Sequence, residues 1–135
     1  MYRLTKAEKA LADETRLRIV NLLLERECCV CEVMQALGIS QTRASRNLGM
    51  LYDAGLLKLR REGLWSLYSI DEEGEFAPLV AGLRSRLETN GLARADRERL
   101  KRAKRLGPLA DHRGARQRDC AAPSGRTPES GDLCL

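Results

Sequence analysis

CEVMQALGISQTRASRNLGMLYDAGLLKLRREGLWSLYSI, residues 31–70, is the stretch that decides the fold of this chain. Its first part predicts a short helix over residues 31–37. Gly38 ends this helix because glycine readily takes the left-handed conformation found after helices. Ser40 is a favourable N-cap residue, so a second helix is predicted from there to about Asp53, with its small and aliphatic residues on one face.

The same stretch then changes its period from that of a helix to that of a strand. Apolar residues recur at Leu57 and Leu59 and again over residues 64–70, and a charged segment at residues 61–63 separates the two groups. This pattern predicts a β-hairpin whose tip is the charged segment. A short helix, a tight turn, a second helix and a basic hairpin are together typical of a winged helix-turn-helix. We therefore expect a mainly α fold with a small β-hairpin.

The flanking segments predict further helices. Residues 5–24 indicate two helices that meet near Ala12 and Asp13. Apolar residues repeat at helical spacing over residues 76–87, which predicts one helix with an apolar stripe larger than a small domain can cover by itself. We therefore expect the fold to be dimeric, with this helix and the N-terminal helix in the interface.

Three regions are expected along the chain. Residues 1–91 would form the winged helix-turn-helix domain that binds DNA and dimerises. Residues 92–106 would form a basic helical extension, and their charge density also allows partial disorder. Residues 107–135 are rich in Gly, Pro, Ser and Arg and predict a flexible tail.

The chain of 135 residues carries a formal net charge of +5, and its positive charge is concentrated in two patches. Residues 40–61 contain five basic residues and one acidic residue, and residues 94–105 contain seven basic and two acidic residues. Such patches favour a nucleic-acid partner. No apolar run is long enough for a membrane span or a signal peptide, so we expect a cytoplasmic protein without a membrane partner.

The predicted second helix and the hairpin provide side chains that suit DNA. A helix can fill the major groove, where polar side chains near its N-terminus reach base edges and Arg neutralises phosphates. The residues expected to contact double-stranded operator DNA are Ser40, Gln41, Thr42, Arg43, Ser45 and Arg46 on the helix, with Arg60 and Arg61 on the hairpin. The alternatives are a solvated helix face and a winged helix that binds only protein, and the basic hairpin favours DNA over both.

Five cysteines are present, and three of them, Cys28, Cys29 and Cys31, lie within four residues. Clustered thiols supply the soft ligands that As(III), Sb(III) and other thiophilic ions prefer. The single histidine, His112, lies in the expected tail, which argues against a histidine-rich zinc or nickel site. Two alternatives remain open, namely cysteines that serve as small buried apolar residues and a thiol redox switch.

The spacing of the cysteines limits how they can bind one ion. Residues two apart on an α-helix point about 200° away from each other, so Cys29 and Cys31 cannot chelate one atom from an intact helix. Either they lie in the loop before the helix, or ion binding unwinds its first turn. Cys28 and Cys31, three residues apart, could converge more easily. A helix N-terminus lowers the pKa of a thiol, and Glu27 and Glu32 oppose this effect.

Enzymatic function is not expected from these motifs. The predicted domain lacks a catalytic Ser/His or Cys/His pairing, a phosphate-binding loop and a cofactor fingerprint, so no cofactor is expected to be required. Cys28 and Cys31 have the Cys-x-x-Cys spacing of a thiol reductase, but no parallel sheet is predicted around them.

Residues 8–76 resemble the ArsR/SmtB family of metalloregulatory repressors in three places. These are KALADETRLRIVNLLLE at residues 9–25, ECCVCEVMQALGISQTRASRNLGMLYDAGLL at residues 27–57 and RREGLWSLYSI at residues 60–70. The resemblance implies a dimeric winged-helix repressor that releases its operator when a metal binds, with recognition residues on the helix at residues 40–53. The chain departs from the family at Asn47, where a histidine is more usual.

The segment ECCVCEV at residues 27–33 is similar to the Glu-Leu-Cys-Val-Cys-Asp-Leu box of the arsenical-sensing branch. This match implies that Cys29 and Cys31 are the ligand pair and that As(III) or Sb(III) is the inducer. The branch often has a third cysteine where this chain has Met34. The remaining candidates for a third ligand are Cys28, Cys120 and Cys134. The function implied is a metalloid-responsive repressor, and the alternative is a redox-sensing or a Cd- or Pb-sensing repressor of the same fold.

Overall fold

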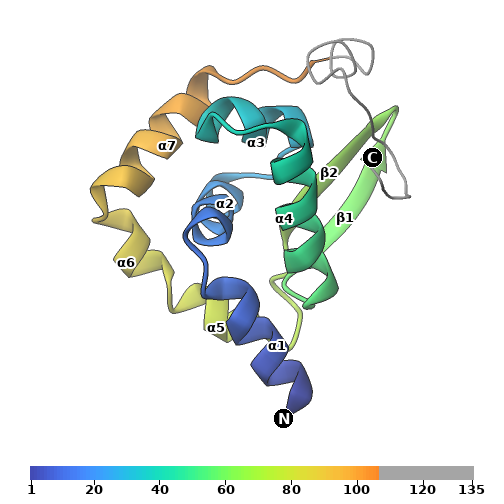
Figure 1. The fold of residues 1–135 in the computed structure, drawn as a ribbon, viewed down its shortest axis with the longest axis vertical. Helices are drawn as coiled ribbons and strands as arrows, with labels where there is room; N and C mark the ends of the chain where they lie inside the picture. Colours follow the sequence, from blue (N-terminus) through green and yellow to red (C-terminus); the bar gives the residue numbers. More distant parts are fainter. Residues whose placement is uncertain (107–135) are drawn as a thin grey trace.

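The computed structural model describes residues 1–106 of the chain. Its elements in chain order are α1 (Tyr2–Leu11), α2 (Glu14–Glu25), α3 (Val30–Leu37), α4 (Gln41–Asp53), β1 (Leu57–Glu62), β2 (Trp65–Ile70), α5 (Ala77–Ala81), α6 (Arg84–Glu88) and α7 (Gly91–Arg102). Figure 1 shows α2 near the centre, with the other helices around it and the hairpin beside α4. The expected tail at residues 107–135 lies outside the described residues, as do Cys120 and Cys134. Over the described range, no helix is long and apolar enough to cross a membrane.

Capping interactions start the helices where the sequence predicts them. The side chain of Asp13 accepts a hydrogen bond from the backbone N–H of Arg16 at 3.0 Å and begins α2. Ser40 Oγ accepts one from the backbone N–H of Arg43 at 3.1 Å and begins α4. Gly38 follows α3 with a φ of +68°, a conformation that favours glycine. The predicted helix-turn-helix is therefore confirmed.

The core lies between α2, α3, α4 and the hairpin. Its largest fully buried apolar side chains are Ile19, Val20, Leu22, Val33, Leu48, Leu51, Leu56 and Val80. The apolar face predicted for α4 is buried, because Ala44, Leu48 and Leu51 share one side of the helix at spacings of three and four residues. The polar face of α4 is consequently left toward solvent.

The hairpin is confirmed, but its turn is shorter than predicted and shares only Gly63 with the expected tip. The strands pair antiparallel from Leu57 opposite Ile70 to Glu62 opposite Trp65. A two-residue turn at Gly63 and Leu64 therefore replaces the charged tip expected at residues 61–63. Gly63 has a φ of +63°, which two-residue hairpin turns require, and Leu64 is 75% exposed rather than part of the second strand.

The single helix expected over residues 76–87 is wrong, because the segment forms α5 and α6 with a break at Gly82 and Leu83. The backbone N–H of Leu83 bonds to the carbonyl of Val80, a three-residue turn that interrupts the helical ladder. Glycine weakens a helix interior, which favours a break there. Phe76 and Val80 are buried in the core, and Leu79 and Leu83 pack against it. The apolar stripe is thus largely covered within the chain itself.

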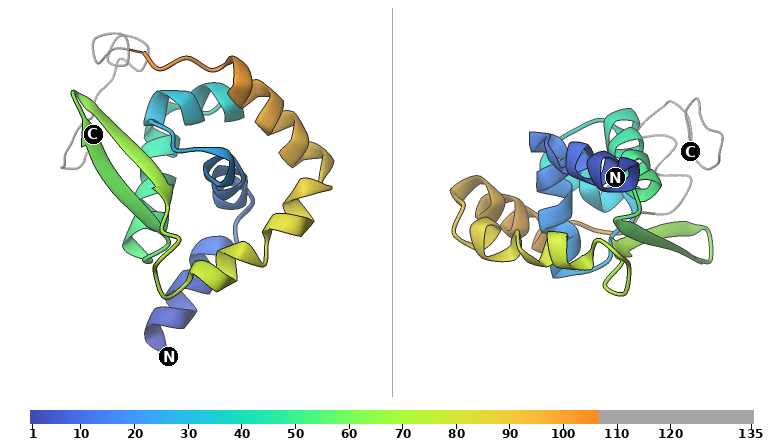
Figure 2. Two further views of the ribbon diagram at one scale, coloured as in Figure 1. Left: turned by 180° about the vertical axis from the view of Figure 1, so that it is seen from behind. Right: turned by 90° about the horizontal axis from the view of Figure 1, so that it is seen from below.

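The basic segment after residue 91 forms α7 as far as Arg102, in keeping with the helical extension expected there rather than with the alternative of partial disorder. The carboxylate of Asp96 in α7 is fully buried and accepts hydrogen bonds from Arg18 Nε at 2.8 Å and Arg18 Nη2 at 2.9 Å. Asn21 Nδ2 donates to the carbonyl of Ala93 at 3.0 Å. These contacts fasten α7 to α2. Figure 2 shows α7 and the hairpin on opposite sides of α2.

Candidate functional site

The polar residues predicted to contact DNA lie at the start of α4. Thr42, Arg43 and Arg46 are exposed, and Gln41 and Ser45 are half-buried. Ser40 is also exposed while its hydroxyl caps the helix. The structure therefore gathers the six predicted residues on the first turns of one helix, next to a basic hairpin.

Asn47 is bonded within the fold. Its Oδ1 accepts a hydrogen bond from Arg16 Nη1 at 3.1 Å, and its Nδ2 donates to the carbonyl of Arg43 at 2.9 Å. Arg16 also donates through Nε to the carbonyl of Ala10 at 2.7 Å. Arg16 thus ties the end of α1 to α4 and fixes the position of that helix. No local pattern indicates the contact between Arg16 and Asn47, because these residues lie 31 positions apart.

The two arginines predicted on the hairpin face different surroundings. Arg60 donates from Nε to Glu27 Oε2 at 3.0 Å and also bonds Glu62 Oε1 at 3.1 Å. The hydrogen bond from Arg60 lowers the pKa of the Glu27 carboxyl. Arg61 points to the other side of the strand, where its Nη1 donates to Ser66 Oγ at 3.2 Å. Arg60 is therefore tied to the segment that carries the cysteines, and Arg61 is not.

Cys28 and Cys29 point in opposite directions because the backbone before α3 is extended. Cys28 pairs with Tyr68 of β2 through two backbone hydrogen bonds of 3.0 Å and 2.9 Å, like one residue of a third strand. Successive side chains of an extended chain alternate between faces. Cys28 consequently enters the main core, where burial raises the pKa of its thiol to about 12. Its sulfur lies 3.5 Å from the carbonyl of Arg26 and is not brought to the other two thiols.

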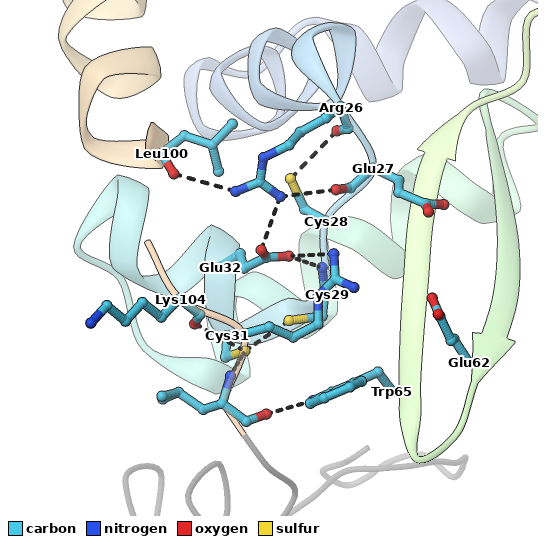
Figure 3. A network of polar contacts seen from close by, with 12 residues as sticks. Arg26, Glu27, Cys28, Cys29, Cys31, Glu32, Glu62, Trp65, Leu100 and Lys104 are labelled. Atoms are coloured by element: carbon cyan, nitrogen blue, oxygen red, sulfur yellow. Dashed lines mark hydrogen bonds and ion pairs between the residues drawn. The ribbon is translucent and has the colours of Figure 1, made fainter. Parts of the chain in front are cut away.

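Cys29 and Cys31 form a close thiol pair, with their sulfurs 2.7 Å apart (Figure 3). Cys29 is the N-cap of α3, with an extended φ of −89° and ψ of 172°, and Cys31 is the second residue of the helix. The two thiols converge although the helix is intact, because the side chain of a non-helical N-cap residue folds back over the first turn. Of the two alternatives predicted, the loop position is the one observed, for Cys29 only.

The pair lies in a buried environment that contains both charges and apolar walls. The apolar side is made by Leu67 and Trp65 of β2. Glu32, also buried, accepts the backbone N–H of Cys29 at 2.9 Å and a hydrogen bond from Arg26 at 2.9 Å. The pKa of the Cys29 thiol is lowered, first by its hydrogen bond with Cys31 and also by the backbone N–H of Glu32, against the effect of burial.

A segment that the sequence did not connect with the cysteines covers the pair. We call residues 103–106, which follow α7, the C-terminal strap. The backbone N–H of Leu106 donates to Cys31 Sγ at 3.3 Å, and the Cys31 thiol lies 3.9 Å from the carbonyl of Lys104. The indole N–H of Trp65 donates to the carbonyl of Leu106 at 2.5 Å. These are main-chain contacts, so no residue type in the sequence indicates them.

The donor set suits a thiophilic ion better than a hard one. Two converging sulfurs, one with a lowered pKa, are soft ligands. Between Met1 and Leu106, no group of three or more His, Cys, Asp or Glu side chains is arranged to hold a metal ion. Cys120 and Cys134, named from the sequence as further ligands, lie outside the described residues.

Comparison with known proteins shows similarity to bacterial regulatory proteins. Residues 13–59 match the family described as "Bacterial regulatory protein, arsR family". The chain is 47% identical over 66 residues to the arsenic resistance transcriptional regulator ArsR1 of Pseudomonas putida, covering 48% of this chain and 52% of that protein. It is 44% identical over 69 residues to the cadmium resistance transcriptional regulatory protein CadC homolog of Staphylococcus aureus, covering 50% of this chain and 57% of that protein. The chain thus spans about half the length of these curated relatives.

A solved structure extends the comparison to the fold. The homodimeric winged helix-turn-helix DNA-binding domain Mb0332 of Mycobacterium bovis, described as a possible ArsR-family regulator, matches with a TM-score of 0.57 and 36% identity. The match covers 64% of this chain and 79% of that chain. The helix-turn-helix, the hairpin and these similarities together show that the chain belongs to the ArsR/SmtB family of winged helix-turn-helix transcriptional regulators.

Proposed function

We propose that this protein is a transcriptional repressor that binds operator DNA as a homodimer and releases it when As(III) or Sb(III) binds Cys29 and Cys31. The observation that carries the proposal is the convergence of these two sulfurs, 2.7 Å apart, beside the helix-turn-helix. No enzymatic step and no resident cofactor is required. A protein of this kind would act on DNA in the cytoplasm.

DNA binding is assigned to the start of α4 and to the hairpin. The exposed polar residues of α4 would reach base edges in the major groove, and the basic hairpin would contact phosphates. The residues proposed for this role are Ser40, Gln41, Thr42, Arg43, Ser45, Arg46, Arg60 and Arg61. Because Arg60 is already paired with Glu27, we expect Arg61 to contribute more to phosphate binding.

Dimerisation is assigned to residues 1–91, with residues 92–106 as an extension packed on α2 and α3. Support comes from the M. bovis domain, which is described as homodimeric. It also comes from α1, where Tyr2 and Leu4 are exposed apolar residues that a second copy would cover.

Inducer binding is assigned to the thiol pair. With arsenite, two As–O bonds would be replaced by two As–S bonds, and the two thiol protons would leave with the displaced hydroxyl groups as two waters. No electron is transferred in this exchange. A third ligand would come from outside the described residues or from solvent, because Cys28 points into the main core.

The test is operator release by the full-length reduced chain, with DNA taken from upstream of its own gene and sodium arsenite as the inducer. We expect arsenite to weaken operator binding by about 5- to 150-fold, the usual range for coupled sites. The double variant Cys29→Ser, Cys31→Ser should bind operator and ignore arsenite. Cys28→Ser is the matched control and should still respond. If the double variant releases DNA at the same arsenite concentration as the parent, the proposed site is wrong.

The alternative inducers can be separated in the same assay. A cadmium resistance regulator is among the relatives, which favours Cd²⁺ or Pb²⁺ as a second candidate. The short distance between the sulfurs of Cys29 and Cys31 favours oxidation as a third. Release by Cd²⁺ or Pb²⁺ but not by arsenite would identify a cation sensor. Release by a thiol oxidant such as diamide, reversed by a phosphine reductant, would identify a redox sensor.

A further inference from the structure

The C-terminal strap binds the same sulfur that an inducer would use. Leu106 donates its backbone N–H to Cys31 Sγ at 3.3 Å, and the Cys31 thiol lies 3.9 Å from the carbonyl of Lys104. Cys29 Sγ also contacts this sulfur. Figure 3 shows the Cys31 sulfur next to Cys29 and to the backbone of Lys104. The strap therefore occupies one lone-pair direction of Cys31 through Leu106 and accepts its S–H through the carbonyl of Lys104, and an ion bound to this sulfur would need both positions.

The strap also joins two elements across the thiol pair. On one side, Gln35 of α3 holds Lys104 by two hydrogen bonds, from its Nε2 to the carbonyl at 2.7 Å and from the backbone N–H to its Oε1 at 3.0 Å. On the other side, the indole of Trp65 in β2 donates to the carbonyl of Leu106. The guanidinium of Arg105 lies 5.8 Å from the centre of the same ring. The four residues of the strap thus connect the hairpin, through Trp65, with the thiol pair, through Cys31.

Placing an ion between the two sulfurs requires them to separate. Two thiolates that each lie about 2.3 Å from one atom are about 3.3–3.8 Å apart when the angle between the two bonds is between about 90° and tetrahedral. The sulfurs of Cys29 and Cys31 are 2.7 Å apart, so their separation must increase by about 0.6–1.1 Å. Cys29 is held by its capping box with Glu32 and by the neighbouring pairing of Cys28 with Tyr68. Besides its contact with Cys29, the Cys31 sulfur is bonded to the strap.

We propose that the C-terminal strap is an internal competitor of the inducer, and that loading the thiol pair releases the strap from Cys31 and Trp65. This inference rests on the proposed function and names its regulation. Trp65 is the first residue of β2, beside the turn of the hairpin, and Arg60 lies on the same face of the hairpin. Release of the strap removes a contact that holds the hairpin in place. Inducer binding can therefore change the position of the DNA-contacting hairpin while α3 stays helical.

The experiment uses Trp65 as its reporter, because it is the single tryptophan of the chain. The probe is phenylarsine oxide, which binds two thiols and exchanges its As–O bonding for two As–S bonds with loss of one water. Full-length protein is kept reduced with a phosphine, and Cys120 and Cys134 are changed to Ser in every variant so that the probe reports on the pair. Titration should shift the Trp65 emission to longer wavelength, complete at one equivalent.

Two variants then test the competition directly. Leu106→Pro lacks the N–H that donates to Cys31, whereas Leu106→Ala keeps it, so the ratio of their affinities isolates that hydrogen bond. We expect Leu106→Pro to bind phenylarsine oxide about three- to tenfold more tightly than Leu106→Ala, the ratio expected when one competing hydrogen bond is lost. Gln35→Ala, an exposed position, should tighten binding in the same direction by releasing Lys104.

The outcomes separate this inference from the proposed function. Constant Trp65 emission through saturation, or equal affinities for the two Leu106 variants together with an unchanged Gln35→Ala, would overturn the strap as competitor while leaving the thiol site in place. Equal probe affinity in the double variant Cys29→Ser, Cys31→Ser would instead overturn the thiol site itself.

Discussion

The substitution Asp96→Ala tests how strongly α7 is anchored to the fold. Asp96 is fully buried and accepts two hydrogen bonds from Arg18, at 2.8 Å and 2.9 Å, and it also pairs with Arg99. Removing the carboxylate leaves Arg18 without its partner. Breaking a buried ion pair costs about 3–5 kcal/mol. Because the Arg18 side chain is 21% exposed and can partly reach water, we expect the lower end, about 3 kcal/mol.

Urea unfolding followed by circular dichroism measures this loss of unfolding free energy. The matched control is Glu98→Ala on the same helix, where the ion pair with Lys101 is 3.1 Å long but both side chains are more than half exposed. The control should cost about 0.5 kcal/mol or less, because exposed pairs contribute little. In thermal unfolding, Asp96→Ala should lower the Tm by about 12 °C or more. If both variants lost the same stability, α7 would not be anchored through Asp96.

Three further predictions concern pH and DNA. Burial raises the pKa of Cys28 to about 12, so the unfolded chain loses this proton first and the unfolding free energy of the reduced protein should fall as pH rises above about 8.5. Cys28→Ala should flatten that fall in urea titrations at about pH 8 and pH 10. Arg46→Ala should cost about 1–3 kcal/mol of operator affinity if Arg46 contacts a base. Arg61→Ala should reduce the slope of log affinity against log salt by about 0.9, because it removes a phosphate contact. Fluorescence anisotropy with labelled operator measures both quantities, and an unchanged value would exclude the corresponding contact. Asn47→Ala should weaken operator binding without changing that slope, because it removes the partner of Arg16 rather than a phosphate contact; a changed slope would contradict this.

Much of the fold could be predicted because its signals are local. Asp13, Gly38 and Ser40 mark helix boundaries through interactions with residues at most four positions away. The period of the apolar residues separates the helices from the hairpin. The two wrong predictions, the position of the hairpin turn and a single helix over residues 76–87, are local as well. Both depend on backbone hydrogen bonds that could equally have formed one or two residues earlier or later.

The candidate site was only partly accessible from sequence. The residue types of Cys29 and Cys31 indicated a thiophilic ion, because thiolate chemistry does not depend on the fold. The distance between their sulfurs depends on whether Cys29 is helical or is the N-cap. A shift of the helix start by one residue therefore decides whether the two thiols converge. Cys28 was a candidate ligand until the pairing of its backbone with Tyr68 directed its side chain into the core.

The sequence by itself determined the winged helix-turn-helix, the basic surface of α4 and the presence of a soft-ligand cluster, because these follow from periodicity, capping residues and side-chain chemistry. Only the tertiary structure decided that the C-terminal strap lies on Cys31, that Arg60 pairs with Glu27 and that Asp96 is buried against Arg18. The physical reason is that these contacts join residues 33 to 78 positions apart, and the strap reaches Cys31 through a backbone N–H rather than through a side chain. Such groups come together only when the helices and the hairpin pack, so local sequence patterns do not predict these contacts.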